Sequence, residues 1–346
     1  MRKRILFVAT GGTIASEMTA FGLKPGVSAE ALLQAVPAIA GLCDVDSEQL
    51  YDLDSTDIGP EHWLGIARVI RENYAGYDGF VISHGTDTMA YSAAALSYLI
   101  QGSVKPIIFT GAQKPIGFDT TDSRVNLLDS FICACRGDMH GVMIVFNGRV
   151  ILGTRARKTH SKSFDAFSSI NYPHIADVRD GRVLQYIVPE YMPEPLFSDV
   201  LDTRVSLMKL IPGAPEAQLE WLLQRSDALV IESFGVGGLP KGMHEAVHAS
   251  AREGKLIVMT TQVQNEGSDL AVYGTGRALS EDPLILEAYD MTTEAAVTKL
   301  MWLLPRAKSQ VEAARLFYTP VSKDILTARV CKQYAPIAPS LSTGAY

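Results

Sequence analysis

The chain has 346 residues, of which 47% are hydrophobic and 20% charged, and its formal net charge is −7. This composition is typical of a globular protein with sizeable cores, and the length suggests about two domains. The negative charge argues against nucleic acid as a partner, because phosphate binding needs clustered Lys and Arg. No stretch approaches the roughly 20 apolar residues that a membrane span needs. We therefore expect no membrane partner, and a cytoplasmic location is the default.

Short apolar runs alternate with helix-period segments in the first half of the chain. The predicted strands cover residues 4–9, 44–54, 79–83, 106–109 and 142–146. The predicted helices cover residues 28–36, 61–74, 88–100 and 122–136. In the last of these helices the apolar spacing predicts a core face formed by Val125, Leu128, Ile132 and Cys135. Strands separated by helices of this length indicate a parallel sheet with right-handed crossovers.

The pattern changes between residues 172 and 215, where prolines recur and there is little helical period. We place a linker at residues 191–212, between an N-terminal α/β domain (1–190) and a C-terminal α/β domain (213–346). Beyond it, predicted strands cover residues 228–232 and 256–259. Predicted helices cover residues 216–224, 241–253 and 292–304, the last with Thr292 as its N-cap. The tail at 335–346 is expected to be loosely held. The predicted class is therefore α/β, with two α/β domains.

Cysteine is sparse and indicates no metal site. The four cysteines match no zinc-binding spacing, and we interpret them as buried, reduced thiols. They are Cys43, Cys133, Cys135 and Cys331.

Two predicted strand ends carry hydroxyl and carboxylate side chains. Thr13 follows Gly11 and Gly12, whereas Thr86 and Asp87 follow the strand at 79–83. Ligands of open parallel sheets bind beyond the carboxyl ends of the strands, so one pocket could receive both threonines. A threonine hydroxyl becomes a nucleophile when a neighbour takes its proton, and a glycine turn leaves N–H groups free for an oxyanion. A plain strand-to-loop turn and a phosphate-cradling loop are the alternatives, and this stretch does not exclude them.

The other candidates also have structural alternatives. Asp87 or Thr88 could simply cap the following helix, and we assign the nearby His84 a structural role. Lys158 lies in a basic stretch that is either a solvated loop or, beside Thr86, a group that helps to deprotonate a hydroxyl. The Asp-Ser-Thr-Asp run at 54–57 suits a turn, and equally a site for the charged groups of an amino acid.

Two motifs carry a family resemblance: Ala9-Thr10-Gly11-Gly12-Thr13-Ile14-Ala15 and Val81-Ile82-Ser83-His84-Gly85-Thr86-Asp87-Thr88-Met89. Supporting matches are Asp54-Ser55-Thr56-Asp57, Thr110-Gly111-Ala112-Gln113, Phe164-Asp165-Ala166-Phe167 and Tyr289-Asp290-Met291-Thr292-Thr293-Glu294-Ala295-Ala296. On these residues the chain resembles the bacterial type I (cytoplasmic) L-asparaginases, of the asparaginase/glutaminase family.

The resemblance implies two α/β domains, with the active site mainly in a larger N-terminal one. It implies hydrolysis of L-asparagine to L-aspartate and ammonia without a metal or cofactor, by a homo-oligomer (dimer or tetramer). Thr13 would be the nucleophile, and Thr86, Asp87 and Lys158 would move protons. The implied substrate-binding residues are Asp54, Ser55, Thr56, Asp87 and Ala112, the last through its backbone carbonyl.

The chain departs from this family in three ways. The loop at 20–26 lacks the usual tyrosine, and Leu23 stands at its position. Arg157 and Val263 stand where a regulatory asparagine site would have Thr and Cys, so allostery is unsupported. Some relatives belong to a tRNA-dependent amidotransferase and carry an extra N-terminal domain. This chain begins at the catalytic strand, so that role is not expected.

Two other functions remain open at this stage. One is a related amidohydrolase that prefers glutamine, since a fit for one methylene is worth only about 1–3 kcal/mol. The other is a binding or sensor protein that has lost turnover, which the missing loop tyrosine would allow. The retention of Thr13, Thr86, Asp87 and Lys158 argues against a pure binder.

Overall fold

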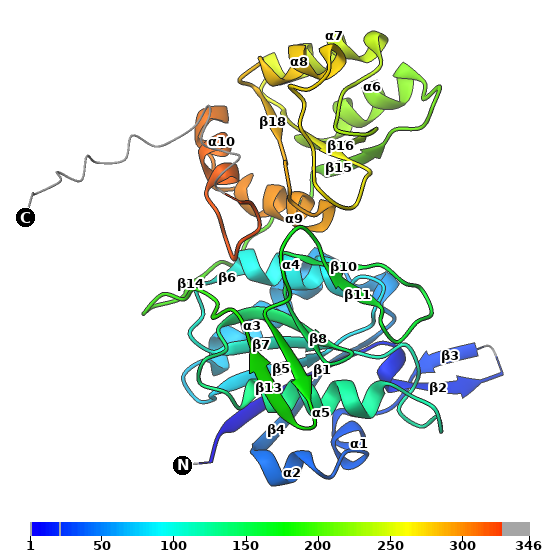
Figure 1. Ribbon diagram of the computed structural model, residues 1–346, viewed down its shortest axis with the longest axis vertical. Helices are drawn as coiled ribbons and strands as arrows, with labels where there is room; N and C mark the ends of the chain where they lie inside the picture. The colour runs from blue at the N-terminus through cyan, green and yellow to red at the C-terminus, as the bar shows by residue number, and fades with distance from the viewer. Residues whose placement is uncertain (1, 21, 327–346) are drawn as a thin grey trace, which may run out of the picture.

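The computed structural model describes residues 2–20 and 22–326, which form a larger N-terminal and a smaller C-terminal domain joined at a narrow waist (Figure 1). Both domains are α/β, as predicted. The predicted loose tail and Cys331 lie outside the described residues. Cys43 and Cys133 are buried, Cys135 is half-buried, and all three are free thiols. In the described part of the chain, no helix is long and apolar enough to span a bilayer.

An eight-stranded sheet forms the N-terminal domain, in the order β13-β12-β9-β8-β7-β5-β1-β4. The strands from β8 to β4 are parallel, and the remaining strands are antiparallel. The parallel sheet was predicted, but its antiparallel extension was not. The parallel strands are β1 (Arg4–Gly11), β4 (Asp44–Leu53), β5 (Gly79–Ser83), β7 (Pro106–Thr110) and β8 (Gly141–Phe146). The antiparallel strands are β9 (Arg149–Leu152), β12 (Ala176–Arg179) and β13 (Arg182–Gln185).

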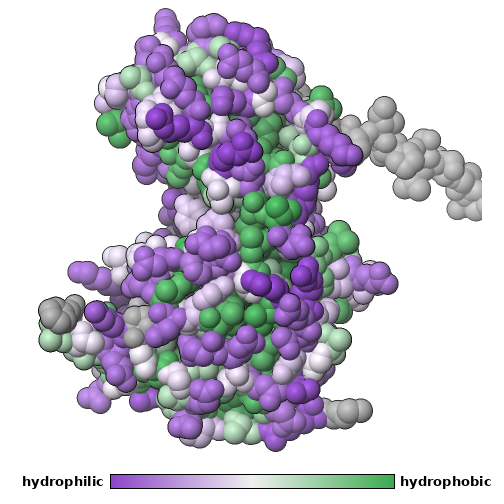
Figure 2. Space-filling model, turned by 180° about the vertical axis from the view of Figure 1, so that it is seen from behind, coloured by the Kyte–Doolittle hydropathy of each residue, from purple (hydrophilic) through white to green (hydrophobic). Residues whose placement is uncertain are grey.

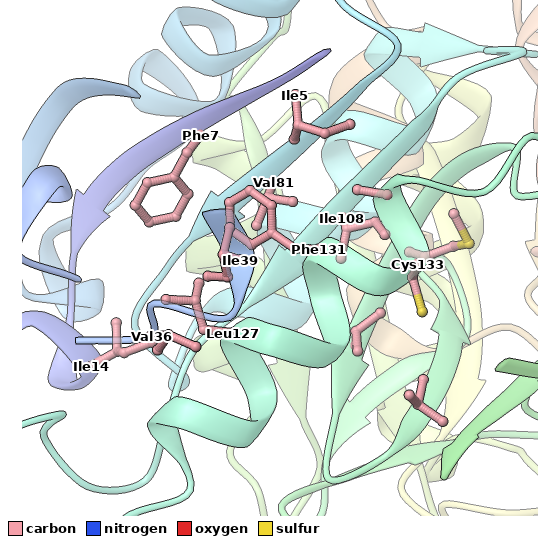
Figure 3. Packing of buried hydrophobic residues seen from close by; sticks show 14 of the residues in the cluster. Ile5, Phe7, Ile14, Val36, Ile39, Val81, Ile108, Leu127, Phe131 and Cys133 are labelled. Carbon is pink, nitrogen blue, oxygen red and sulfur yellow. The ribbon is translucent and has the colours of Figure 1, made fainter. Parts of the chain in front are cut away.

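Helices cover both faces of this sheet because the central strands are apolar on both faces. Side chains alternate along β1, so Phe7 packs into one core and Leu6 into the other. The first core lies against α1 (Ala29–Gln34), α2 (Ile39–Leu42) and α5 (Ser123–Ala134), and in it the rings of Phe7 and Phe131 lie 5.8 Å apart (Figure 3). The second core lies against α3 (Pro60–Asn73) and α4 (Met89–Leu99).

The predicted core face of α5 is only partly correct: Leu128 and Cys135 pack half-buried against the core, but the centre of the buried face lies elsewhere. Val125 is 58% exposed, whereas Leu127 and Phe131 are fully buried. Polar contacts explain the rotation, because Asn126 Nδ2 donates to the carbonyl of Gly111 (3.0 Å) and its Oδ1 accepts from the N–H of Asn147 (2.9 Å). The two hydrogen bonds of the buried Asn126 amide decide which face of α5 turns inward. The apolar periodicity of the helix does not decide it, because a stripe shifted by one residue is almost as apolar.

Three two-stranded ribbons were not predicted. They are short, and both strands of each ribbon lie in segments without clear alternation. The ribbons are β2 (Ser16–Thr19) with β3 (Gly22–Pro25), β6 (Ile100–Gln101) with β14 (Leu196–Phe197), and β10 (Ala156–Lys158) with β11 (Phe167–Ser169).

A four-stranded parallel sheet forms the C-terminal domain, in the order β15-β16-β17-β18. Its first strand, β15, lies inside the segment 191–212 that was predicted as a linker, so the C-terminal sheet begins at Val205. The strands are β15 (Val205–Lys209), β16 (Ala228–Ser233), β17 (Leu256–Thr261) and β18 (Ile285–Glu287). The helices are α6 (Glu216–Arg225), α7 (His244–Arg252), α8 (Gly274–Ser280), α9 (Thr293–Leu303) and α10 (Gln310–Tyr318).

The two domains meet where α4 faces α9 (Figure 1). Tyr98 of α4 is fully buried in a core that otherwise consists of C-terminal residues such as Leu300 and Phe317. This contact explains why α4 is buried all round rather than on one face. Apolar surface is also visible at the waist from behind (Figure 2). Thr292 caps α9 as predicted, its hydroxyl accepting from the N–H of Ala295.

Candidate active site

The two glycine turns pack directly against each other. β1 and β5 are neighbouring parallel strands, with Ala9 paired to Ser83. Gly12 has φ +78°, and a Cβ atom on it would lie 2.3 Å from the backbone nitrogen of Gly85. Only glycine permits this approach. The two predicted motifs therefore meet backbone to backbone, and Thr13 and Thr86 each follow a residue of this contact.

Thr13 is the first residue of a short 3₁₀ helix, Thr13–Ala15, and is half-buried. The hairpin β2–β3 follows it and projects from the domain (Figure 1). Leu23 pairs with Met18 in this hairpin, and both side chains are exposed, by 42% and 66%. The position expected for a tyrosine thus carries an apolar side chain on an exposed ribbon.

Thr86, Asp87 and Lys158 form one hydrogen-bonded group. Lys158 Nζ donates to Thr86 Oγ1 at 2.8 Å and to Asp87 Oδ1 at 2.6 Å. The side chain of Lys158 is only 18% exposed, whereas that of Asp87 is 61% exposed. The solvated-loop alternative for Lys158 is therefore wrong. Its strand, β10, is held by β11 through the pairing of Lys158 with Phe167.

The capping alternative is also not what the structure shows. Thr88 stands at the N-cap of α4 but makes no side-chain cap bond. Its hydroxyl instead donates to the carbonyl of Ser55 at 2.7 Å. The carboxylate of Asp87 faces Lys158.

The run at 54–57 lies against the same turns. Ser55 is 4% exposed, and a Cβ on Gly85 would lie 2.6 Å from the Ser55 Cβ. The carboxylate of Asp54 accepts both from the N–H and from the hydroxyl of Thr56, each at 2.9 Å. The run is therefore a turn, as its residues suggest, and the turn also borders the candidate site.

A third strand end adds Ala112, which is fully buried after β7. The backbone N–H of His84 donates to the carbonyl of Thr110 at 2.8 Å. A Cβ on Gly111 would lie 2.3 Å from the His84 carbonyl oxygen. The carboxyl ends of β1, β5 and β7 thus converge at one edge of the sheet, together with every predicted site residue that these strands carry.

His84 has the structural role that we assigned to it. The ring is fully buried, with Nδ1 2.7 Å from the Gly85 carbonyl and Nε2 2.9 Å from Ser92 Oγ, which accepts from Trp63. Burial lowers the pKa of His84 to about 4. The neutral ring therefore donates from Nδ1 and accepts at Nε2 from Ser92, which supports the turn without reaching the reacting groups.

Gln113, which was noted only as part of a motif, and Asp122 were not predicted as site residues. Thr86 Oγ1 donates to Gln113 Oε1 at 3.3 Å, and Gln113 Nε2 donates to the carbonyls of His160 and Ser163. The Asp122 carboxylate accepts from the N–H of Gln113, and burial raises its pKa. Only the position of Gln113 directly after Ala112 could have indicated its role.

No group of three or more His, Cys, Asp or Glu side chains suited to a metal occurs within residues 2–20 and 22–326. A cavity of about 400 Å³ lies at the opposite edge of the sheet, beside the start of β8. His140, Tyr191 and Lys323 help to line it, and none of the predicted site residues does. This cavity is therefore separate from the convergence of strand ends.

Both halves of the chain match known protein families. Residues 4–189 match the family described as Asparaginase, N-terminal, and residues 204–317 match the Glutaminase/Asparaginase C-terminal domain. L-asparaginase 1 of Escherichia coli K12 is 35% identical over 320 residues, which is 88% of this chain and 93% of that protein. A glutamyl-tRNA(Gln) amidotransferase component of Pyrococcus horikoshii is 33% identical and covers 93% of this chain, which spans 76% of that protein.

Solved structures show the same fold. The thermostable L-asparaginase from Thermococcus kodakarensis superposes with a TM-score of 0.86 at 38% identity, covering 93% of this chain and 99% of that one. L-asparaginase I from Vibrio cholerae gives a TM-score of 0.84 at 29% identity, covering 94% of this chain and 100% of that one. These relatives are archaeal as well as bacterial, so the comparisons support the family rather than its bacterial type I group. The chain belongs to the asparaginase family.

Proposed function

We propose that this protein hydrolyses L-asparagine to L-aspartate and ammonia. The observation that carries the proposal is the group formed by Lys158, Thr86 and Asp87, held beside the glycine turn that presents Thr13. A lysine within hydrogen-bonding distance of a buried hydroxyl is the arrangement that proton transfer to or from that hydroxyl requires. A protein that only binds amino acids has no need of it.

Thr13 is the proposed nucleophile. Its Oγ1 attacks the side-chain amide carbon of asparagine, its proton goes to the leaving nitrogen, and ammonia departs to leave an ester on Thr13. A backbone N–H group just after Gly12 would stabilise the oxyanion, since the N–H of Gly12 itself donates to the carbonyl of Leu53 at 2.9 Å. Because Leu23 offers no hydroxyl, activation of Thr13 has to come from another group or from water.

Lys158 and Thr86 are proposed to serve the second step. Neutral Lys158 takes the proton of the Thr86 hydroxyl, which in turn takes a proton from the water that attacks the ester. Thr13 then leaves with a proton and L-aspartate is released. Asp87, at 2.6 Å from Lys158, would stabilise the charge on the lysine when it is protonated.

The proposed substrate contacts lie around these groups. The exposed carboxylates of Asp54 and Asp87 suit the α-ammonium group, and the turn at Ser55 and Thr56 suits the α-carboxylate. The backbone carbonyl of Ala112 would accept from the leaving amide. We further propose a cytoplasmic homo-oligomer, in line with a 26% identical Campylobacter jejuni structure described as a probable cytoplasmic L-asparaginase.

Glutamine is the second candidate substrate, because the relatives include components of a glutamyl-tRNA(Gln) amidotransferase. One additional methylene changes affinity by only about 1–3 kcal/mol. We expect measurable but slower turnover of L-glutamine.

The test is ammonia release from L-asparagine and L-glutamine by the unmodified protein and by three variants. Thr13→Ala should abolish turnover, and Lys158→Met should reduce it by about 10²–10⁴-fold. Lys162→Met is the matched control, since the same change is made to an exposed lysine in the loop after Lys158. Turnover that survives Thr13→Ala would remove Thr13 as the nucleophile. A protein that is stabilised by asparagine without hydrolysing it would be a sensor rather than an enzyme.

A further inference from the structure

The ribbon that carries Lys158 is anchored at its root by the C-terminal domain. Arg155 directly precedes β10, and its side chain is fully buried. Its Nη2 donates to the Asp290 carboxylate and its Nη1 to the Asp290 carbonyl, each at 2.8 Å, while its Nε donates to the carbonyl of Lys323. All of these acceptors belong to the C-terminal domain.

Neighbouring bonds hold the same segment. Thr292 Oγ1 donates to the carbonyl of Thr154 at 3.2 Å, and Thr154 Oγ1 donates to the carbonyl of Ser322 at 2.6 Å. The carbonyl of Arg155 accepts from Ile170 N–H at 2.8 Å, which closes the ribbon against the end of β11. The backbone at 154–155 therefore has little freedom to shift.

The connection from this anchor to the catalytic lysine is short and extended. Three residues of strand span at most about 10 Å, so a displaced Arg155 would move Lys158 with it. Between them, Arg157 Nε lies 3.7 Å from the Glu294 carboxylate of α9. Strand β10 thus has its root and its middle residue against C-terminal acids, whereas Lys158 contacts Thr86 and Asp87 of the N-terminal domain.

The chemistry of the anchor favours a positioning role. A buried ion pair is an inefficient source of stability, because desolvation offsets the attraction. The planar guanidinium nevertheless accepts only a narrow range of geometries, so the pair specifies one arrangement of its two segments. Asp290 is itself oriented, because its carboxylate also accepts from the N–H of Leu326.

We propose that Arg155 and Asp290 are positioning residues for Lys158, and that the C-terminal domain thereby sets the catalytic lysine of the same protomer. The inference rests on the proposed function of Lys158. It assigns the C-terminal domain a role in proton transfer that is independent of any partner copy.

The first variant is Asp290→Asn, which keeps the size of the side chain and removes its charge. A misplacement of about 1 Å can cost up to about 10²-fold in rate, so we expect kcat for asparagine to fall at least about tenfold. KM should change less than about twofold, because the substrate contacts proposed at Asp54 and Ser55 lie on another loop. The pH profile of kcat should also shift, because the surroundings of the Lys158 amine change.

The control is Leu219→Ala, which opens a cavity in an apolar core of the C-terminal domain that contains neither Asp290 nor the segment 322–324. It should lower the melting temperature by a similar amount and leave kcat and its pH profile unchanged. An equal loss of kcat in this control would overturn the proposal, because loosening of the domains in general would then explain both results.

A double variant, Arg155→Met with Asp290→Leu, covers the case in which Asp290→Asn does not fold. Apolar replacement of a buried pair is often neutral for stability, so a folded protein with reduced kcat is expected. Wild-type kcat and pH profile in either folded variant would overturn the proposal.

A second readout does not require activity. The lysines are methylated with ¹³C, and the Lys158 resonance is identified by its loss in Lys158→Met. Asp290→Asn should move the titration of that resonance, and Leu219→Ala should not. If the unmodified protein does not hydrolyse asparagine, the proposed function fails, whereas this titration still decides the positioning role. An unmoved resonance would overturn the positioning role.

Discussion

Replacement of Gly12 by alanine should disrupt the site more than any ordinary surface change. Its φ of +78° and ψ of −178° lie in a region that is essentially restricted to glycine and costs a residue with a Cβ about 1–3 kcal/mol. The added Cβ would also lie 2.3 Å from the nitrogen and 2.4 Å from the Cα of Gly85, which are backbone atoms that cannot rotate away. Overpacking of this kind costs about 1–3 kcal/mol. We therefore expect Gly12→Ala to lower the free energy of unfolding by about 2–6 kcal/mol.

Gly181→Ala is a reference for a positive φ without a steric contact. Gly181, in the turn between β12 and β13, has φ +70°, and no atom would lie within 4 Å of its added Cβ. Gly181→Ala should therefore lower the free energy of unfolding only by the cost of a positive φ, about 1–2 kcal/mol. The additional loss in Gly12→Ala comes from the glycine-only backbone region of Gly12 and from the contact between the turns that present Thr13 and Thr86.

The assay combines urea unfolding with ammonia release at saturating asparagine. Gly12→Ala should lower kcat by up to about 10²-fold, because separation of the turns displaces the proposed nucleophile. Gly181→Ala should keep the kcat of the unmodified protein. If Gly12→Ala loses no more stability than Gly181→Ala and retains full activity, the backbone contact between the two turns does not organise the site.

Three further predictions concern the pH dependence, the core and a helix cap. The unfolded wild-type chain protonates His84 at its normal pKa, whereas the folded chain does so only near pH 4, so the wild type loses stability as the pH falls from 6.5 to 4. The destabilisation caused by His84→Gln, relative to the wild type, should therefore shrink by about 3 kcal/mol over this range. A constant difference would contradict the neutral buried ring. Phe131→Ala should cost about 3–5 kcal/mol and Val125→Ala less than about 0.5 kcal/mol in urea unfolding, and the reverse order would restore the predicted face of α5. Ser309→Ala should cost about 1 kcal/mol, since Ser309 Oγ accepts from the N–H of Glu312 at the start of α10, and an unchanged melting temperature would show that the cap is replaced by water.

The central strands could be predicted because their signal is local. Residues 79–83 were predicted as a strand, and β5 is Gly79–Ser83. Parallel strands are covered by helices on both faces, so their near-continuous apolar runs are recognisable without knowledge of their neighbours. Helix α3 was recognisable from its sequence as well, because Trp63, Ile66 and Ile70 recur at helical spacing and form its buried face.

The missed elements depend on partners that are distant in sequence. β15 is short, its apolar and polar residues do not alternate regularly, and it becomes a strand by pairing with β16. The face of α5 depends on where Asn126 finds an acceptor, the Gly111 carbonyl, and a donor, the Asn147 N–H. Neither outcome can be obtained from periodicity within a single segment.

For the candidate site, the residues that follow strand ends were recognisable from the sequence. Gly11, Gly12 and Thr13, and likewise Gly85 and Thr86, adjoin apolar runs, so their placement at one edge of a parallel sheet follows from its topology. Lys158 had no such signal, because a basic residue in a polar stretch is compatible with a solvated loop.

The amino-acid sequence was therefore sufficient for the two α/β domains, the order of their central strands and helices, and the two turns that meet at the site. The assembled protein alone places Lys158 against Thr86, 72 residues away, and anchors Arg155 to Asp290, 135 residues away. The position of a strand end depends on the apolar pattern of nearby residues. A side-chain hydrogen bond between segments that are distant in sequence depends instead on the packing of every element between them.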